Sequence, residues 1–188
     1  MSVKKISLLA VLMILAAASC AKAAELAFIR NGEKGGTFIW TYDTETGKEK
    51  KCTVGYDAEI SPDGRKIAFT AYGERAERRV AIYDIEKGTE RKLESEYLTR
   101  NLRDKNFEPN DYGPRWSPEG NAIMLNRFVE GSTWTPVIIE LNSDGTEGKE
   151  FMPAAPGGNT AAAKTLFSIF WSADGKSIYG SNLDEIFR

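Results

Sequence analysis

A turn motif followed by an apolar strand recurs along the sequence at nearly constant spacing. The three full copies occupy residues 59–69, 115–125 and 170–180. The motif serine recurs as Ser61, Ser117 and Ser172, which gives spacings of 56 and 55. A partial copy begins at residues 26–28, where Leu-Ala-Phe matches the Ile-Ala-Phe of the first full copy at a spacing of 41. Repetition of this length indicates an array of similar supersecondary units.

Each copy has the chemistry of a sharp reversal between two strands. In the first copy Pro62 fixes φ for the turn, Asp63 follows, and Gly64 supplies a left-handed residue at little steric cost. The second half of the unit is also repeated, as an apolar strand that ends in a glycine-containing turn. This half occupies residues 38–47, 80–88 and 136–145. Together the halves predict one four-stranded antiparallel blade for each repeat.

Ser-Pro-Asp-Gly, then Ile-Ala-Phe, then Ile-Tyr-Asp and a glycine turn resembles the repeat of TolB-like, or WD40-like, β-propeller proteins. The resemblance covers nearly all of residues 26–188 and implies an all-β fold, a β-propeller of four-stranded antiparallel blades. Glu119 replaces the aspartate in the second copy, and Ala173 replaces the proline in the third. No sustained helical periodicity follows residue 23, so no helix is predicted there.

The repeats predict an incomplete propeller of about three and a half blades within residues 24–188. The predicted blades are 26–58 without its first strand, 59–114, 115–169, and the partial 170–188. Propellers typically have about 4–8 blades and close on themselves. Two explanations stay open, a truncated gene product or a second chain that completes the propeller.

Residues 1–23 have the pattern of an export signal. Lys4 and Lys5 precede an apolar run at residues 6–18, which is too short to span a membrane. Residues 21–23 offer an ordinary cleavage site, whereas Cys20 ends a sequence similar to a bacterial lipobox and would carry a lipid. We therefore expect an exported, periplasmic protein, with a membrane-anchored lipoprotein or a secreted protein as alternatives.

Composition argues against several kinds of chemistry. The sequence has no histidine and two cysteines, so we expect no catalytic residues, metal site, cofactor or disulfide framework. Cys52 reads as a small packed side chain in a strand. Cleavage after residue 23 removes three lysines, which changes the formal charge from −2 to −5 and argues against nucleic acid binding.

Blade spacings of 56 and 55 exceed the usual length of about 40–45 residues and imply inserted loops. The first insertion spans residues 94–113, and the second spans residues 151–164. Because long loops on a rigid scaffold often carry binding residues, the first insertion is the predicted partner-binding loop. The predicted residues are Tyr97, Arg100, Arg103, Asp104, Phe107 and Tyr112. The alternative is a solvated loop whose aromatic residues pack against the blade.

Other conspicuous residues are predicted to have structural roles. Asp63, Glu119 and Asp174 occupy the same turn position in each copy, and Trp116 and Trp171 are expected in the core between blades. The predicted function is a non-catalytic scaffold that binds an envelope protein or peptide, with membrane contact only through Cys20. The alternatives are a module that binds a small ligand, peptide or glycan, and the propeller of a larger peptidase- or lyase-type enzyme.

Overall fold

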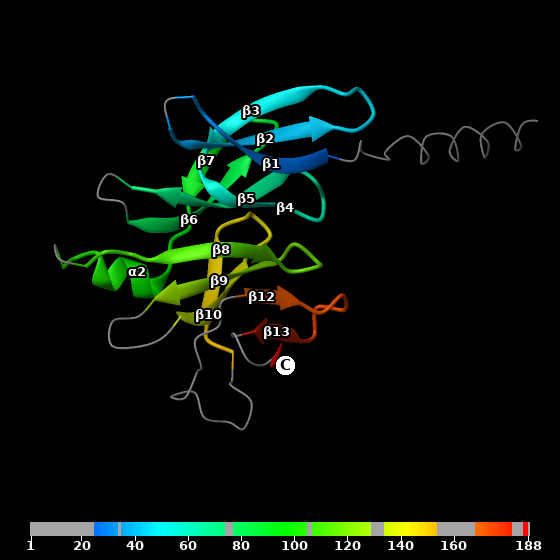
Figure 1. The fold of residues 1–188 in the computed structure, drawn as a ribbon. Coiled ribbons are helices and arrows are strands. Elements are labelled where there is room, and N and C mark those ends of the chain that lie inside the picture. The colour runs from blue at the N-terminus through cyan, green and yellow to red at the C-terminus, as the bar shows by residue number, and fades with distance from the viewer. Residues whose placement is uncertain are drawn as a thin grey trace, which may run out of the picture.

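The computed structural model shows four antiparallel sheets that stack face to face in the order in which they occur along the chain (Figure 1). It describes residues 25–33, 35–73, 77–104, 107–128, 134–153, 168–181 and 186–187. The predictions for residues 1–23, including Cys20, and most of the second insertion lie outside these residues. The predicted all-β fold of antiparallel blades is confirmed.

Sheet one has three strands, as expected from a repeat that lacks the strand before its turn motif. β1 (Glu25–Asn31) pairs with β2 (Thr37–Asp43), and β2 pairs with β3 (Glu49–Val54). In the β2–β3 turn the Asp43 carboxylate accepts hydrogen bonds from the backbone N–H groups of Glu45 and Thr46, both at 2.9 Å. These bonds tie the turn to the strand that precedes it.

Sheet two is a complete four-stranded blade. Its strands, in spatial order, are β4 (Tyr56–Ile60), β5 (Lys66–Tyr72), β6 (Arg78–Asp84) and β7 (Thr89–Lys92). Gly55 alone separates β3 from β4. A Cβ atom at Gly55 would lie 2.7 Å from the carbonyl oxygen of Thr70, so the close approach of this connection to β5 requires glycine.

Sheet three repeats the same order, and sheet four is partly described. Sheet three contains β8 (Asp111–Trp116), β9 (Ala122–Phe128), β10 (Trp134–Leu141) and β11 (Glu147–Phe151). Sheet four contains β12 (Ser168–Trp171), β13 (Ile178–Ser181) and β14 (Ile186–Phe187). The connection from sheet two to sheet three contains the first insertion, whereas the connection from sheet one to sheet two is Gly55 alone.

The first insertion contains a short helix, α2 (Glu96–Asn101), which the sequence analysis did not predict. Ser95 caps it, because the Ser95 hydroxyl accepts a hydrogen bond from the N–H of Leu98 at 3.2 Å. Leu98 is buried, so α2 is held by one apolar anchor and a cap. A helix this short cannot show helical periodicity in a sequence.

The repeated turn is a small hydrogen-bonded unit. In the first copy the Ser61 hydroxyl donates to the Asp63 carboxylate at 2.6 Å and accepts from the N–H of Lys66 at 2.9 Å. The same two bonds recur at Ser172 and Asp174, with Ser177 as the donor to the serine. The serine therefore clamps the turn across its base, which supports the structural interpretation of the acidic residues.

The copy with glutamate uses an additional residue. The Ser117 hydroxyl donates to the Asn121 side-chain oxygen at 2.9 Å, and the Asn121 amide donates to Glu119 at 3.0 Å. Ser117 still accepts from the next strand, through the N–H of Ala122 at 3.0 Å. The longer acid thus keeps the turn closed through the asparagine that follows it.

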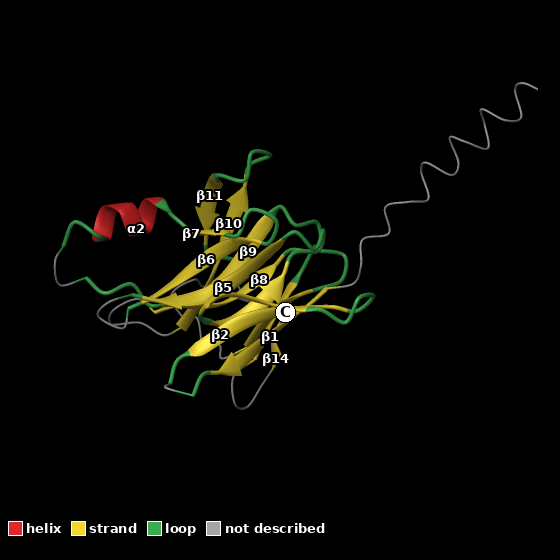
Figure 2. Cartoon of the chain, turned by 90° about the horizontal axis from the view of Figure 1, so that it is seen from above, coloured by secondary structure: helices red, strands yellow, loops and turns green. Residues whose placement is uncertain are grey.

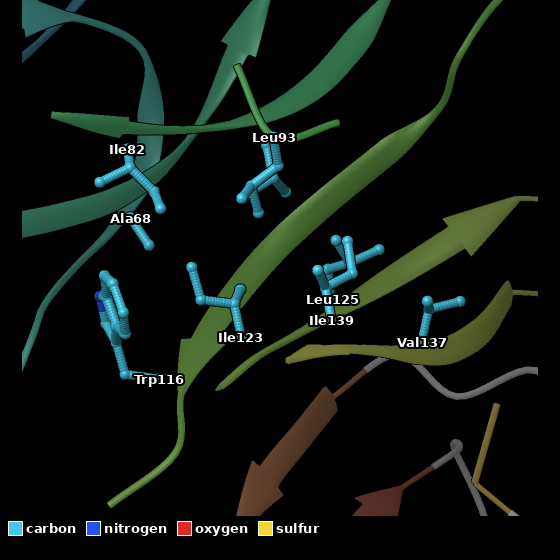
Figure 3. Close-up of a cluster of buried hydrophobic side chains, with 9 residues drawn as sticks. Ala68, Ile82, Leu93, Trp116, Ile123, Leu125, Val137 and Ile139 are labelled. Carbon is cyan, nitrogen blue, oxygen red and sulfur yellow. The ribbon is translucent and has the colours of Figure 1, made fainter. Parts of the chain in front are cut away.

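The core lies between the sheets, and each junction has its own apolar cluster. Figure 3 shows the cluster between sheets two and three, where Ile123, Leu125 and Ile139 are completely buried. Burying one such side chain stabilises a fold by about 1.5–3 kcal/mol. Cys52 is half-buried at the first junction, and burial raises the pKa of its thiol, consistent with a packed side chain.

The two tryptophans of the motif join neighbouring sheets, as predicted. The indole N–H of Trp116 donates to the carbonyl oxygen of Glu59 at 3.2 Å, and that of Trp171 donates to the carbonyl oxygen of Arg115 at 3.3 Å. Glu59 and Arg115 occupy the same repeat position on successive first strands. The bond between sheets is therefore repeated together with the sequence motif.

The blades begin earlier than the predicted boundaries. β4 starts at Tyr56 rather than at 59, β8 at Asp111 rather than at 115, and β12 at Ser168 rather than at 170. A register irregularity interrupts the pairing between Tyr56 and Glu59, and another lies between Tyr112 and Arg115. These bulges break the alternation of side chains, so the recognisable motif starts only after them.

Candidate binding surface at the loop face

The strand connections fall at two opposite ends of the sheets. The motif turns and the glycine turns lie at one end, on the right of Figure 1. The connections from the second to the third strand of a blade, and from one sheet to the next, lie at the other end, which we call the loop face. Figure 2 shows α2 projecting beyond the strands on this side. Binding that depends on long connections is to be sought there.

An ion cluster of Arg127, Asp111 and Glu150 lies beneath α2. The Arg127 guanidinium is 1% exposed and makes two bonds of 2.8 Å to Asp111 and one of 2.8 Å to Glu150. Burial raises the pKa of Asp111, and the two bonds from Arg127 oppose that shift. The cluster joins three strands of sheet three, which gives it a structural role.

Two of the predicted partner-binding residues cover this ion cluster. The Tyr97 ring lies 4.5 Å from the Arg127 guanidinium carbon and meets the Phe107 ring edge to face at 5.9 Å. Tyr97 and Phe107 are therefore partly buried anchors of the insertion. For these two residues the alternative interpretation, aromatic side chains packed against the blade, describes the structure better.

The other predicted residues separate into two places. Arg100, Arg103 and Asp104 are exposed on α2 and the turn after it, where a partner could reach them. Tyr112 lies on the first strand of sheet three and belongs to a different group of side chains. The structure thus does not bring the six predicted residues together into one site.

The group around Tyr112 is an aromatic patch on the loop face. Its members are Tyr56, Tyr72, Arg78, Tyr112, Phe128 and Trp134. The Trp134 ring lies 4.7 Å from Tyr112 and 5.2 Å from Phe128, and the rings of Tyr56 and Tyr72 stack at 4.8 Å. The guanidinium carbon of Arg78 is 5.3 Å from the Tyr112 ring and 5.4 Å from the Trp134 ring. Trp134 is therefore packed against its neighbours.

Two of these rings present much of their surface to solvent. Tyr72 is 58% exposed and Phe128 is 41% exposed, while Tyr56, Tyr112 and Trp134 are half-buried. Burial also raises the pKa of Tyr56 and of Tyr112, so both phenols keep their protons at neutral pH. The patch therefore offers apolar surface and hydroxyl donors around one positive charge.

The aromatic patch consists of three repeat positions, each used twice. Tyr56 corresponds to Tyr112, Tyr72 to Phe128, and Arg78 to Trp134, and the members of each pair are separated by the same spacing of 56. The sequence analysis named Tyr112 and did not assign the other five members to a site. The equal spacing was the signal that could have found them.

The backbone beneath the patch follows the same repeat. Asp57 has a φ of 53°, and Gly113, at the equivalent position of the next blade, has a φ of 63°. Such an angle is rare for a residue with a side chain. The Thr70 hydroxyl donates to the Asp57 carboxylate at 3.3 Å and accepts from the Gly113 N–H at 3.0 Å. Thr70 thereby ties the first strands of two neighbouring blades together under the aromatic rings.

A cavity of about 490 Å³ lies at the opposite end, between sheets three and four. Its lining combines Trp171 and Phe151 with Glu140 and Lys176. Residues 154–167, which connect Phe151 to sheet four, are outside the described part of the chain. We therefore assign no ligand to this cavity.

Within the described ranges, no group of three or more histidine, cysteine, aspartate or glutamate side chains could hold a metal ion. The predictions of no metal and no cofactor stay predictions. No described helix is long and apolar enough to cross a membrane.

The chain is similar to solved β-propellers. TolB from Acinetobacter baumannii superposes with a TM-score of 0.59 at 19% identity, over 83% of this chain and 34% of that one. A TolB-type protein from Agrobacterium tumefaciens gives 0.60 at 18% identity, over 86% and 52%. The acylaminoacyl peptidase of Pyrococcus horikoshii gives 0.51 at 15% identity, over 86% and 26%. No protein-family model matches the sequence, and no curated protein matches it.

The chain thus spans about a third to a half of the two TolB structures that it matches. At these identities the likeness establishes the fold. The four sheets, their repeated turns and these superpositions together show that the chain has the fold of an incomplete TolB-like β-propeller.

Proposed function

We propose that this chain is part of a non-catalytic, exported β-propeller scaffold that binds a partner protein or peptide of the cell envelope. The observation that carries the proposal is the aromatic patch, in which Arg78 lies over the half-buried Tyr112 and Trp134 rings, and the Tyr72 and Phe128 rings are exposed on the loop face. Tyrosine, tryptophan and arginine are the residues most enriched at the energetic centres of protein interfaces.

The patch has the rigidity that a binding surface needs. Its residues stand at the ends of paired strands, and Tyr112 and Phe128 flank the Trp134 ring. Because these rings are already packed, a partner orders few side chains when it binds. This lowers the entropic cost of association.

The insertion extends the same face. α2 is fixed through Tyr97 and Leu98, which leaves Arg100 and Arg103 exposed on the loop face. We assign the exposed residues of the insertion to the rim of the interface and the aromatic patch to its centre. Such a division, with polar groups around an apolar core, is common at protein interfaces.

The pattern of residues 1–23 supports export, and the fold supports a scaffold in the periplasm. Cleavage after residue 23 would give a soluble protein, whereas lipidation at Cys20 would tether the same scaffold to a membrane. The intact mass of the protein recovered from its own cells distinguishes the two, because acyl groups on Cys20 add mass.

Site-specific photo-crosslinking tests the proposal. A benzoylphenylalanine at position 72 or 128 should give a discrete adduct with a partner protein in the cells of origin. The same residue at position 87, an exposed lysine in a glycine turn at the opposite end, is the matched control. Adducts at 72 and 128 but not at 87 support the proposal. Equal adducts at all three positions, or none at 72 and 128, contradict it.

A second candidate is the propeller of a peptidase, which the likeness to the acylaminoacyl peptidase favours. This candidate requires a catalytic domain in the same reading frame. Sequencing the gene beyond this segment decides the matter, because further propeller repeats followed by a stop codon exclude it. A small-ligand module would instead show a ligand-dependent rise in melting temperature.

A further inference from the structure

Arg78 has no counter-charge in the described part of the chain. Arg115 of β8 also forms no ion pair with a described carboxylate, whereas four other arginines of the sheets pair with glutamate or aspartate. These pairs are Arg30 with Glu49, Arg79 with Glu94, Arg91 with Glu147, and Arg127 with Asp111. Arg78 makes no such pair with any described carboxylate, although it is half-buried. Burying part of a charged group without a partner raises the free energy of the folded chain, so an unpaired Arg78 calls for an explanation.

The surroundings of Arg78 fix its position. Its backbone N–H donates to the carbonyl oxygen of Pro109 at 3.0 Å, and its guanidinium lies over the Tyr112 and Trp134 rings. The nearby carboxylate of Asp57 accepts from Thr70 instead. The guanidinium is therefore placed among aromatic rings while its N–H donors lack an anionic acceptor among the described residues.

A second donor stands beside it. The Tyr56 hydroxyl lies close to Arg78 and Tyr72 but completes no hydrogen bond of normal geometry with any described group. The Tyr72 ring, which stacks on Tyr56, is the exposed member of that pair. A guanidinium without an anion and a hydroxyl without an acceptor together match one ligand group, a carboxylate, which accepts from both.

We propose that the aromatic patch recognises a peptide segment of its partner through an aspartate or glutamate side chain bound to Arg78. This inference rests on the proposed function, because it specifies what the patch binds. The aliphatic or aromatic neighbours of the acidic residue pack on Tyr72, Phe128 and Trp134. The Tyr56 hydroxyl, which lies close to Arg78 and has no described acceptor, donates to the same carboxylate.

Selection from a random-peptide phage library tests this inference. The library is panned in parallel on the purified chain and on the variants Arg78→Gln and Trp134→Ala. Arg30→Gln is the matched control, because Arg30 also lies over a tryptophan and a phenylalanine, but it is paired with Glu49 and lies on sheet one. Circular dichroism and melting curves establish that each variant is folded.

The expected result is enrichment of aspartate or glutamate beside an apolar residue in peptides selected on the wild-type chain and on Arg30→Gln. Arg78→Gln should weaken the affinity for a selected peptide by about tenfold. Replacing the aspartate or glutamate of that peptide by asparagine or glutamine should weaken the affinity equally. Arg78→Gln combined with the amide peptide should lower the affinity little more than either change alone, because both remove the same contact.

Other outcomes separate this inference from the proposed function. Peptides that require Trp134 but show no acidic preference would overturn carboxylate recognition and leave the patch as a binding surface. Peptides unaffected by both Arg78→Gln and Trp134→Ala would overturn both. Failure to select any peptide would overturn peptide recognition, and the photo-crosslinking result would then decide whether a folded partner uses the patch.

Discussion

The ion cluster and the aromatic patch both combine an arginine with aromatic side chains, but we assign a structural role to the first and a binding role to the second. Each places an arginine against aromatic rings on the loop face. Arg127 is buried and bound to two carboxylates, with Tyr97 over it. Arg78 lies over Tyr112 and Trp134 and has no described carboxylate partner. An arginine whose bonds are completed inside the fold supports stability, whereas one without a described carboxylate partner is the one that we propose for binding.

The largest effect expected from this contrast is at the ion cluster. Arg127→Met should lower the free energy of unfolding by about 3–5 kcal/mol, because Asp111 and Glu150 would remain buried without a counter-charge. Urea unfolding measures the change. The double variant Arg127→Met with Asp111→Leu should recover part of the loss. If the single variant were as stable as wild type, the cluster would not have the structural role assigned to it.

A smaller effect is expected where α2 meets the cluster. Tyr97→Ala removes the ring over Arg127 and its contact with Phe107, and it should cost about 1–2 kcal/mol. Hydrogen exchange should quicken at the Leu98 amide, which is bonded to the cap. Arg100→Ala, on the exposed side of the same helix, is the control and should change the unfolding free energy by less than about 0.5 kcal/mol. Equal effects of the two substitutions would contradict an anchoring role.

The pH dependence of stability tests a second charge whose hydrogen bonds are completed inside the fold, the Asp63 carboxylate of the first motif turn. Burial raises the pKa of Asp63, but the Ser61 hydroxyl and the Arg65 N–H outweigh it, and the pKa lies below its usual value. Its contribution is therefore present above the unfolded pKa of about 4 and is lost as pH falls through the folded pKa.

Because Asp63 is largely exposed, solvent screening keeps that contribution below about 1 kcal/mol. Asp63→Asn should flatten the acid limb of a plot of unfolding free energy against pH and leave the slope above pH about 5 unchanged. An acid limb identical to that of wild type would show that the carboxylate contributes nothing to the turn.

The smallest effect on stability is expected at Arg78. Arg78→Gln gives up two ring contacts but no described ion pair, so it should change the unfolding free energy by about 0.5 kcal/mol. The same variant should abolish the adducts formed by a photo-crosslinker at position 128. A large loss of stability would show that Arg78, like Arg127, is a structural residue, and would contradict the distinction drawn between the two.

The architecture was accessible from the sequence because each repeat carries its own turn chemistry. Ser61 and Ser172 close their turns with the acid that follows shortly after, and Trp116 marks the junction between sheets. These interactions are local or repeat at fixed spacing. The starts of the second and third blades were misplaced because bulges next to Asp57 and Gly113 interrupt the strand pattern.

The ion cluster was hidden because its members come from different strands, whereas the spacing of 56 that relates the patch residues was present in the sequence but was not used. Arg127, Asp111 and Glu150 are far apart in the sequence, and no motif links them. Arg78 carries an ordinary charge in an ordinary strand, and only the structure shows that no described carboxylate pairs with it. The helix α2 escaped prediction because one cap and one buried leucine are a weak signal against an all-β background.

The repeated tryptophan bond between sheets determines how the fold should come apart. Each junction holds a cluster of side chains that belong to that pair of sheets, and the second and third junctions add an indole N–H bond. Stability is then close to a sum of sheet terms and nearest-neighbour terms, as in linear repeat arrays. Damage at one junction should uncouple the sheets on either side of it while each side keeps its own order. Unfolding would therefore proceed sheet by sheet rather than in a single concerted step.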